Sequence, residues 1–291
     1  MFSLRCGWSV TQIQGARAYQ EDRFAIIDGP TLHVGSETAV VAEYDAGPCQ
    51  LLVVVADGMG GMGHGDVAAE IVVRQFAQTW LSFRDAGIAP RECLEIAMHS
   101  ANQRVGQAVG EEPSRAGMGS TLLAVFFDWA AKSMWWVSVG DSLLLRFRRN
   151  ALSQLNEEHS ARRYLEIRQA SASARGGEPD LAEATMLENP AALVSAITGD
   201  PLEWIDLPDA ATAIRAGDVF AIASDGLDFL SRETLSGKLA QCSTRGRCAD
   251  RGEGLVKHVR SVGEDIVDAL KERAHPHQDN ATLALVRFVS G

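Results

Sequence analysis

Short apolar runs and longer periodic segments alternate along the chain. The short runs are rich in β-branched and aromatic residues, a composition that predicts strands rather than helices. These predicted strands cover residues 24–27, 51–56, 122–127, 135–139, 143–147, 219–223 and 282–288.

Apolar residues between these runs recur at intervals of three and four positions, which predicts helices with one buried face. The first predicted helix has Asp66 as its N-cap. The second begins at Pro90 and ends near Gly110, in agreement with the preference of proline for the first helical turn. The apolar positions of the first helix are Ala68, Val72, Phe76, Trp80 and Phe83, and those of the third are Leu255, Val259, Val262, Ile266 and Leu270.

The order of these elements favours an α+β fold. Two consecutive helices follow two strands, and three strands then follow one another, so a βαβ repeat is excluded. We expect one domain over residues 1–291, because no proline- or serine-rich linker divides the chain. Residues 161–190 are interpreted as a mobile flap or a loosely packed helix, and residues 241–254 as a loop.

Composition and charge narrow the classes of function. The chain is 46% hydrophobic and 22% charged, which is typical of a globular protein, and its net charge of −11 argues against partners such as nucleic acid or an anionic membrane. No secretory signal is evident, and no apolar run reaches the roughly 18–20 residues that span a bilayer. The odd number of scattered cysteines favours reduced thiols and a cytoplasmic location.

A glycine-dense turn follows the predicted strand at 51–56. Gly58, Gly60 and Gly63 match the G-x-G-x-x-G dinucleotide-binding fingerprint. That fingerprint requires a further strand and an acidic residue about 20 positions later, where this chain has two predicted helices instead. We therefore reject a dinucleotide site.

Acidic residues stand at the ends of several predicted strands. A carboxylate beside exposed backbone carbonyls supplies the oxygen ligands that hard divalent cations prefer. For any single Asp-Gly pair, an ordinary turn is the better interpretation. Together, these carboxylates would repel one another in a folded core unless cations lay between them, so the set predicts a metal site. Its members are Glu21, Asp22, Asp57, Asp141, Asp225 and Asp279.

Several motifs in this order resemble the bacterial branch of the metal-dependent type-2C serine/threonine protein phosphatases. The resemblance covers residues 15–288. The motifs that carry it are GARAYQEDRF, VVADGMGG, GMGSTLLAVF, VSVGDS, EEHS, LVSAITGD, AGDVFAIASDGLDFLS and DNATLALV.

The resemblance implies a four-layer αββα sandwich, in which helices flank two central antiparallel sheets, with a metal centre at one edge. Two or three Mn²⁺ or Mg²⁺ ions are the implied cofactors. Carried over to this chain, the motifs imply that Asp57 bridges two ions and that the Gly58 carbonyl ligates one. Asp225 and Asp279 would complete the other site.

Further roles follow from the same resemblance. Glu21 and Asp22 would hold water molecules bound to the ions, and Arg17 would bind the substrate phosphate. Asp141 would join Asp225 in binding a third, weaker ion. In this scheme the metal pair generates hydroxide near neutral pH for direct attack on phosphoserine or phosphothreonine, without a phosphoenzyme.

The chain departs from the family pattern in the glycine-dense turn. Relatives usually place histidine where this sequence has Met62, and His64 follows two residues later. His64 is either a proton donor from a shifted turn or an exposed histidine without a catalytic role. We interpret His159 as structural, and His275 and His277 as part of a surface turn.

The expected function is a monomeric metal-dependent phosphatase acting on phosphoproteins opposite a serine/threonine kinase. One alternative is a pseudophosphatase scaffold that binds a phosphoprotein or a kinase without turnover. Another is a small-molecule phosphoesterase, for which a deep closed pocket under residues 161–190 would be the signature.

Overall fold

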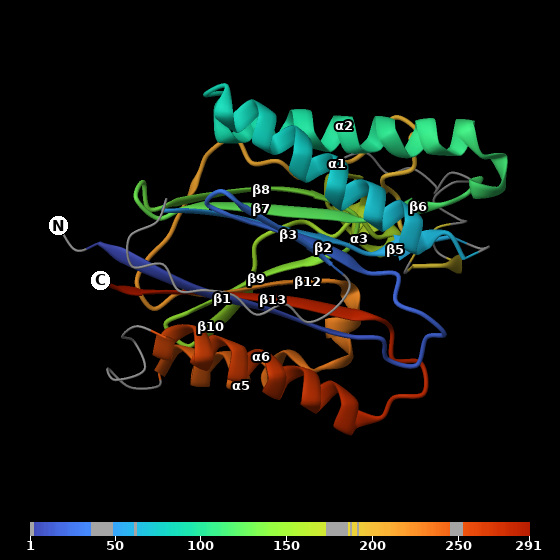
Figure 1. Ribbon diagram of the computed structural model, residues 1–291. Helices are drawn as coiled ribbons and strands as arrows, with labels where there is room; N and C mark the ends of the chain where they lie inside the picture. The colour runs from blue at the N-terminus through green and yellow to red at the C-terminus, as the bar shows by residue number, and fades with distance from the viewer. Residues whose placement is uncertain are drawn as a thin grey trace.

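Two antiparallel sheets lie face to face at the centre of the protein (Figure 1). The computed structural model describes residues 3–35, 49–60, 63–172, 186, 188–190, 192–244 and 253–291. The six-stranded sheet has the order β11 (Thr212–Ala213), β8 (Ser133–Val139), β7 (Leu122–Asp128), β4 (Gln50–Ala56), β2 (Arg23–Asp28) and β3 (Thr31–Gly35). The five-stranded sheet has the order β1 (Leu4–Ile13), β13 (Ala281–Ser290), β12 (Val219–Ala223), β9 (Leu143–Arg148) and β10 (Ala151–Gln154).

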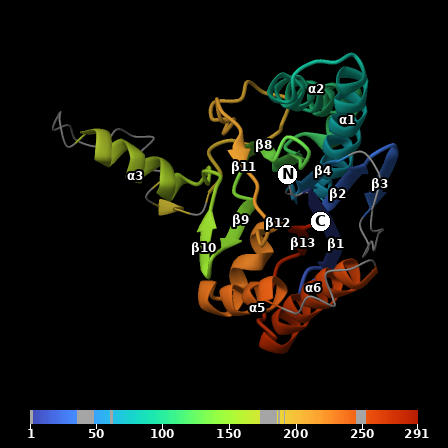
Figure 2. The same cartoon turned by 90° about the vertical axis from the view of Figure 1, so that its left-hand side faces the viewer.

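Helices cover the outer face of each sheet (Figure 1). α1 (Gly65–Asp85) and α2 (Pro90–Glu111) pack on the six-stranded sheet, while α5 (Arg232–Thr244) and α6 (Glu253–Arg273) pack on the five-stranded sheet. In Figure 2, α3 (Ala161–Ala172) projects away from the sandwich. Two short 3₁₀ helices, η1 (Pro113–Arg115) and η2 (Asp225–Phe229), and a small hairpin of β5 (Gly58–Met59) and β6 (Gly119–Ser120) complete the described elements.

Strand β4 shows why the predicted strands are almost continuously apolar. Leu51, Val53 and Val55 face the other sheet, whereas Leu52 and Val54 face α1 and α2. Alternate residues of a strand point to opposite faces, so a strand covered on both sides is apolar at every position. This burial on both faces confirms the α+β class and the αββα layers.

All the strands and the three helices predicted from the sequence are present, with ends that differ by a few residues. The prediction omitted β1, whose apolar residues Cys6, Trp8 and Val10 alternate on one face only. Its other face carries Gly7, Ser9 and Thr11, which are small enough for α6 to approach closely: a Cβ on Gly7 would lie 2.6 Å from Leu255 Cγ.

The prediction also omitted α5. Leu235, Leu239 and Cys242 form its buried face at helical spacing. Ser231 precedes the helix, and its Oγ accepts a hydrogen bond from the Thr234 amide at 3.1 Å, an N-cap that was readable from the sequence. The predicted loop at 241–254 is wrong at both ends, which are helical in α5 and α6, and residues 245–252 lie outside the described residues.

Asp66 is not the N-cap of α1, contrary to the prediction. The helix begins at Gly65 with His64 at the N-cap position and no side-chain capping bond. The turn brings Gly58 and Gly65 so close together that a Cβ on Gly58 would lie 2.1 Å from the Gly65 carbonyl oxygen. Asp66 therefore lies inside the first turn, where a carboxylate interacts favourably with the helix dipole.

The remaining regional predictions have mixed outcomes. Of the two interpretations of residues 161–190, the helix is the one observed over 161–172. Residues 173–185 lie outside the described residues. None of the described helices combines the length and the apolar character needed to cross a bilayer.

The aromatic cluster between the sheets yields a test of the fold. Phe127 is fully buried, with its ring centroid 5.2 Å from that of Phe220 and 5.5 Å from that of Phe288. Phe127→Ala should lower the free energy of unfolding by about 3–5 kcal/mol, because it leaves a cavity between strands from both sheets. Urea unfolding followed by circular dichroism measures the change. The control Leu32→Ala, at an exposed position, should change it by about 0.5 kcal/mol or less.

Candidate metal centre

Acidic strand ends from both sheets meet in one cavity of about 240 Å³. Asp57 follows β4 directly, whereas one residue separates Asp141 from the end of β8 and Asp225 from the end of β12. Glu21 and Asp279 stand shortly before β2 and β13, which run antiparallel to β4 and β12 and so begin where those strands end. The residues predicted for the site that line the cavity are Arg17, Glu21, Asp57, Gly58, Asp141, Asp225 and Asp279.

Asp57 is held by the neighbouring strand segment that contains Thr121. Its backbone N–H donates to Thr121 Oγ1 at 2.9 Å, and the Thr121 N–H donates to the Asp57 carbonyl at 2.8 Å. Thr121 Oγ1 also lies 2.9 Å from Ser142 Oγ, next to Asp141. This buried hydroxyl therefore links the backbones that present two of the predicted ligands.

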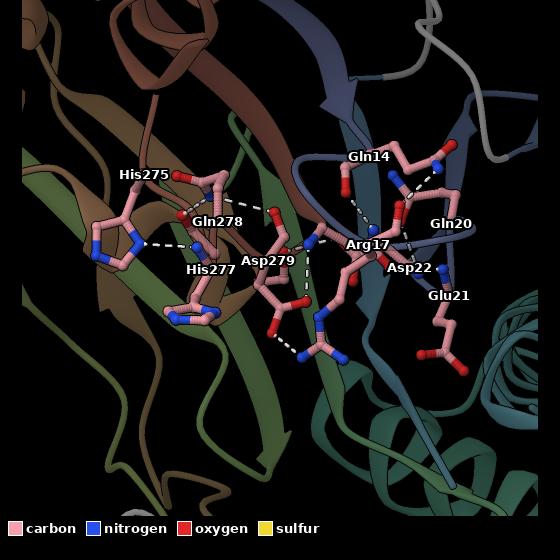
Figure 3. A network of polar contacts seen from close by, with 12 residues as sticks. Gln14, Arg17, Gln20, Glu21, Asp22, His275, His277, Gln278 and Asp279 are labelled. Atoms are coloured by element: carbon pink, nitrogen blue, oxygen red, sulfur yellow. Dashed lines mark hydrogen bonds and ion pairs between the residues drawn. The ribbon is translucent and has the colours of Figure 1, made fainter. Parts of the chain in front are cut away.

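Arg17 reaches the cavity from the loop between β1 and β2 (Figure 3). Its guanidinium forms an ion pair with the Asp279 carboxylate, which raises the pKa of Arg17. Gly15 lets the loop pass close to β13: its φ is +64°, and a Cβ there would lie 2.3 Å from the Asp279 carbonyl oxygen. The Ala16 amide donates to the Gln278 carbonyl at 2.7 Å, which fixes the loop at this point.

Asn280 attaches the same loop to β13 and was not among the predicted site residues. Its Oδ1 accepts the Glu21 amide at 2.7 Å, and its Nδ2 donates to the Gln14 carbonyl at 2.7 Å. A buried amide that uses both ends of its side chain in this way is part of the scaffold that positions Glu21. Its position directly after Asp279 in the sequence could have identified Asn280 as a candidate site residue.

Asp22 lies behind the cavity rather than on its surface. The residue is fully buried, and its Oδ2 accepts hydrogen bonds from Ser224 Oγ at 2.8 Å and Thr282 Oγ1 at 2.6 Å. Burial raises the pKa of Asp22 to about 6, although the two hydroxyls lower it. The structure thus places Asp22 next to the ligand-bearing strands without bringing it to the cavity wall.

Several of the carboxyl groups that face the cavity have a raised pKa. Burial is the main cause for Asp57, Asp141 and Asp225, and the charges of neighbouring aspartates add to it. The pKa of Asp141 is raised to about 7.

The donor set fits divalent cations. Glu21 Oε1 and Asp225 Oδ1 are buried oxygens of cavity-lining residues without a hydrogen-bond partner, and each is a hard ligand suited to Mg²⁺ or Mn²⁺. Within the described ranges, no three acidic, histidine or cysteine side chains are already arranged around one ion. The ion pair with Arg17 occupies an Asp279 oxygen that a cation would use, so a cation bound there would have to break it.

The histidines do not join the predicted ligands. His64 is the N-cap residue of α1 and does not line the cavity, so its role as a proton donor stays a prediction; Met62 lies outside the described residues. His159 is fully buried, its Nδ1 accepts the Gly140 amide at 3.1 Å, and burial lowers its pKa to about 4. A neutral, packed His159 agrees with its interpretation as structural.

Comparison with known proteins places this arrangement in a family. Residues 41–270, which include Asp57, Asp141 and Asp225, match the family described as Protein phosphatase 2C. The serine/threonine protein phosphatase PstP of Mycobacterium tuberculosis is 30% identical over 186 residues, covering 63% of this chain and 33% of that protein. The chain therefore spans about a third of that relative's length. A serine/threonine phosphatase of Listeria welshimeri is 28% identical and is covered over 84% of its length, with 81% of this chain.

Solved structures show the same fold. The crystal structure of the M. tuberculosis phosphatase PstP/Ppp has a TM-score of 0.67 at 23% identity, covering 97% of this chain and 98% of that chain. A structure of the PstP catalytic domain with two manganese ions has a TM-score of 0.64 at 23% identity, covering 99% of this chain and 100% of that chain. The αββα fold is thus shared with solved phosphatase structures. The family match over residues 41–270 shows that the chain belongs to the protein phosphatase 2C family.

The raised pKa values predict how cation binding depends on pH. In the metal-free protein, Asp22 and Asp141 have a pKa of about 6 and about 7, above the value of roughly 3.9 in an unfolded chain. Their contribution to stability is therefore fully present below about pH 4 and is lost as the pH rises through 6 and 7. Cation binding needs the ionised forms, so it strengthens over the same range.

At a fixed Mn²⁺ concentration, the rise in melting temperature should be larger at about pH 7.5 than at about pH 5.5, because fewer protons must be displaced. Differential scanning fluorimetry with and without Mn²⁺ at each pH measures the shift and cancels effects common to both samples. A shift that is equal at the two pH values, or larger in acid, would contradict the assignment of the cavity as a metal site.

Thr121 tests how the backbone positions Asp57. Thr121→Val keeps the shape but removes the hydroxyl, and should weaken Mn²⁺ binding by roughly 10–100-fold, the range seen when a supporting hydrogen bond to a ligand is lost. Thr121→Ser retains the hydroxyl and should bind Mn²⁺ within a few-fold of wild type. Isothermal titration calorimetry measures both, and equal affinities for the valine and serine variants would show that the hydroxyl has no such role.

Proposed function

We propose that this chain is a metal-dependent protein phosphatase that hydrolyses phosphoserine and phosphothreonine in proteins. The observation that carries the proposal is the meeting of acidic strand ends from both sheets in one cavity with Arg17 at its edge. Membership of the protein phosphatase 2C family and the printed names of its relatives support it.

The predicted ligand assignment is retained as part of this proposal. Asp57 and the Gly58 carbonyl would hold one ion, and Asp57 would share a second with Asp225 and Asp279. Asp141 would join Asp225 at a third, weaker site. When bound, Mn²⁺ or Mg²⁺ lowers the pKa of a coordinated water and neutralises phosphoryl oxygens, so that direct hydrolysis becomes possible near neutral pH.

The chain's own residues then bind and orient the substrate. The side chain of Arg17 is 53% exposed, and its planar guanidinium matches the oxygens of a phosphate. If Asp279 ligated a cation, its ion pair with Arg17 would be lost, and the guanidinium would be available to the phosphoryl group. Glu21, held through its amide by Asn280, faces the cavity from the other side of the loop.

Direct hydrolysis also agrees with the nucleophiles present. Among the described residues that line the cavity, Thr121 is the single one with a hydroxyl or thiol side chain. Its Oγ1 is already engaged by the Asp57 amide and Ser142 Oγ. A covalent phosphoenzyme on a free hydroxyl or thiol therefore has no candidate among the described residues of this cavity.

The position of α3 favours a protein substrate over a small molecule. A deep pocket closed by residues 161–190 would suit a small phosphoester, whereas α3 projects away from the sandwich (Figure 2). We propose a phosphoprotein as the substrate and a serine/threonine kinase as the opposing enzyme. A monomeric state and a cytoplasmic site of action complete the proposal.

Two ligand variants test this function against the pseudophosphatase alternative. Asp57→Asn and Asp225→Asn should each lower Mn²⁺-dependent hydrolysis of p-nitrophenyl phosphate and of a phosphothreonine peptide by more than about 100-fold, which exceeds the loss expected from a supporting hydrogen bond. Initial rates of metal-stripped protein titrated with Mn²⁺ measure the effect. Asp209→Asn, at a fully exposed side chain, is the matched control and should retain wild-type rates. Folded wild-type protein without turnover would instead support the scaffold.

A further inference from the structure

A second, largely apolar groove of about 850 Å³ lies beside the acidic cavity. One wall comes from α3, through Tyr164 and Ile167, and the opposite wall from Leu193, Val194 and Trp204. Ile167 is one of the few large apolar side chains with substantial exposure, at 38%. An apolar recess of this size with exposed walls is typical of a binding surface rather than of ordinary packing.

Leu193 connects the groove to the acidic cavity, because its side chain lines both. Its backbone is fixed by pairing with the segment before α3. The Ala161 amide donates to the Ala192 carbonyl at 2.8 Å, and the Val194 amide donates to the His159 carbonyl at 2.9 Å. A chain bound with its phosphate at the acidic cavity would therefore have this groove as its immediate neighbour.

Trp204, in the wall opposite α3, is held in place by several contacts. The Trp204 ring stacks on His159 with centroids 4.5 Å apart and an angle of 17° between the planes. Ser195 Oγ donates to the Trp204 carbonyl at 2.7 Å and holds the backbone of the tryptophan. His159 also accepts a hydrogen bond from the Gly140 amide. Trp204 is therefore connected through His159 to the residue that precedes Asp141.

A pre-formed apolar wall lowers the entropic cost of binding, since its side chains need little ordering. Arg168 and Glu203 also line the groove, but apolar residues predominate, and burial of a charged group against them is unfavourable. An aliphatic or aromatic side chain of the bound protein is the chemical group that this wall suits.

We propose that this groove binds an apolar side chain of the phosphoprotein substrate, within about four residues of the phosphorylated serine or threonine, as the rise of about 3.3 Å per residue in an extended chain allows. The proposal rests on the phosphatase function proposed above and adds a preference in the substrate sequence. The acidic cavity would bind the phosphorylated residue, and the groove would bind an apolar side chain close to it in the substrate sequence.

A set of phosphothreonine peptides tests this preference. In each peptide a single leucine occupies one of the positions on either side of the phosphothreonine in an alanine background, and the reference peptide contains no leucine. With Mn²⁺ present, kcat/KM should be about tenfold higher for one or two adjacent leucine positions, in line with partial burial of a leucine side chain.

Ile167→Ser should bring kcat/KM for the preferred peptide close to that of the reference. Its kcat/KM for p-nitrophenyl phosphate, which has no side chain to place in the groove, should equal that of wild type. Glu166→Gln is the matched control, because it changes the adjacent exposed position of α3 without altering the groove, and it should keep the preference. Ile167→Leu should also keep it.

Equal kcat/KM for all the peptides would overturn the proposal, as would a preference that survives in Ile167→Ser. A dimer that Ile167→Ser dissociates, detected by analytical ultracentrifugation, would identify a second copy of the chain as the occupant and would also overturn it. If the wild-type protein did not hydrolyse p-nitrophenyl phosphate at all, the proposed phosphatase function would be wrong, and not the proposed groove. Peptide binding in Mn²⁺, measured by fluorescence anisotropy, would then still report whether the leucine preference exists.

Discussion

The mutual repulsion of carboxylates at one edge of the sandwich is the constraint around which this structure is organised. Asp57, Asp141 and Asp225 come from three strand ends and two different sheets, and strand pairing fixes where each of them emerges. In the metal-free protein, burial raises the pKa of Asp57 and Asp141 and the charges of neighbouring carboxylates raise it further, while Asp279 forms an ion pair with Arg17. Cations would relieve the same repulsion without neutralising the ligands, which is why we propose a metal site at this edge.

The two cores on either side of each sheet keep these strand ends in place. Val53 and Val54, for example, are both fully buried on opposite faces of β4, the strand that ends one residue before Asp57. A strand packed on both faces has little freedom to shift or rotate, because either movement would open cavities in two cores at once. The loop that bears Arg17 lacks this support and depends on hydrogen bonds to Gln278 and Asn280. Such a loop suits the role that we propose for Arg17, in which it would exchange Asp279 for a phosphate.

Local patterns predicted those parts of the molecule whose signals lie within a few residues of one another. Strands buried on both faces, such as β4 and β12, were predicted because every position is apolar, and the acidic strand ends were predicted because aspartate and glycine follow such runs directly. Strand β1 was missed because Gly7, Ser9 and Thr11 face α6 and interrupt the apolar pattern. Asp66 was assigned as a cap because sequence alone does not show how closely Gly58 and Gly65 approach. Thr121 and Asn280 act through contacts between distant segments, and the recess of Asp22 depends on Ser224 and Thr282, so their positions required the folded structure.

The most direct test of the account is the electron paramagnetic resonance spectrum of the protein loaded with Mn²⁺. If Asp57 is a shared ligand, two Mn²⁺ ions lie close enough to be exchange-coupled, and wild type should show the spectrum of a coupled pair that Asp57→Asn loses. An uncoupled, single-ion spectrum at saturating Mn²⁺ in wild type, or a coupled pair that is unchanged in Asp57→Asn, would contradict the claim that this carboxylate cluster is a two-metal centre.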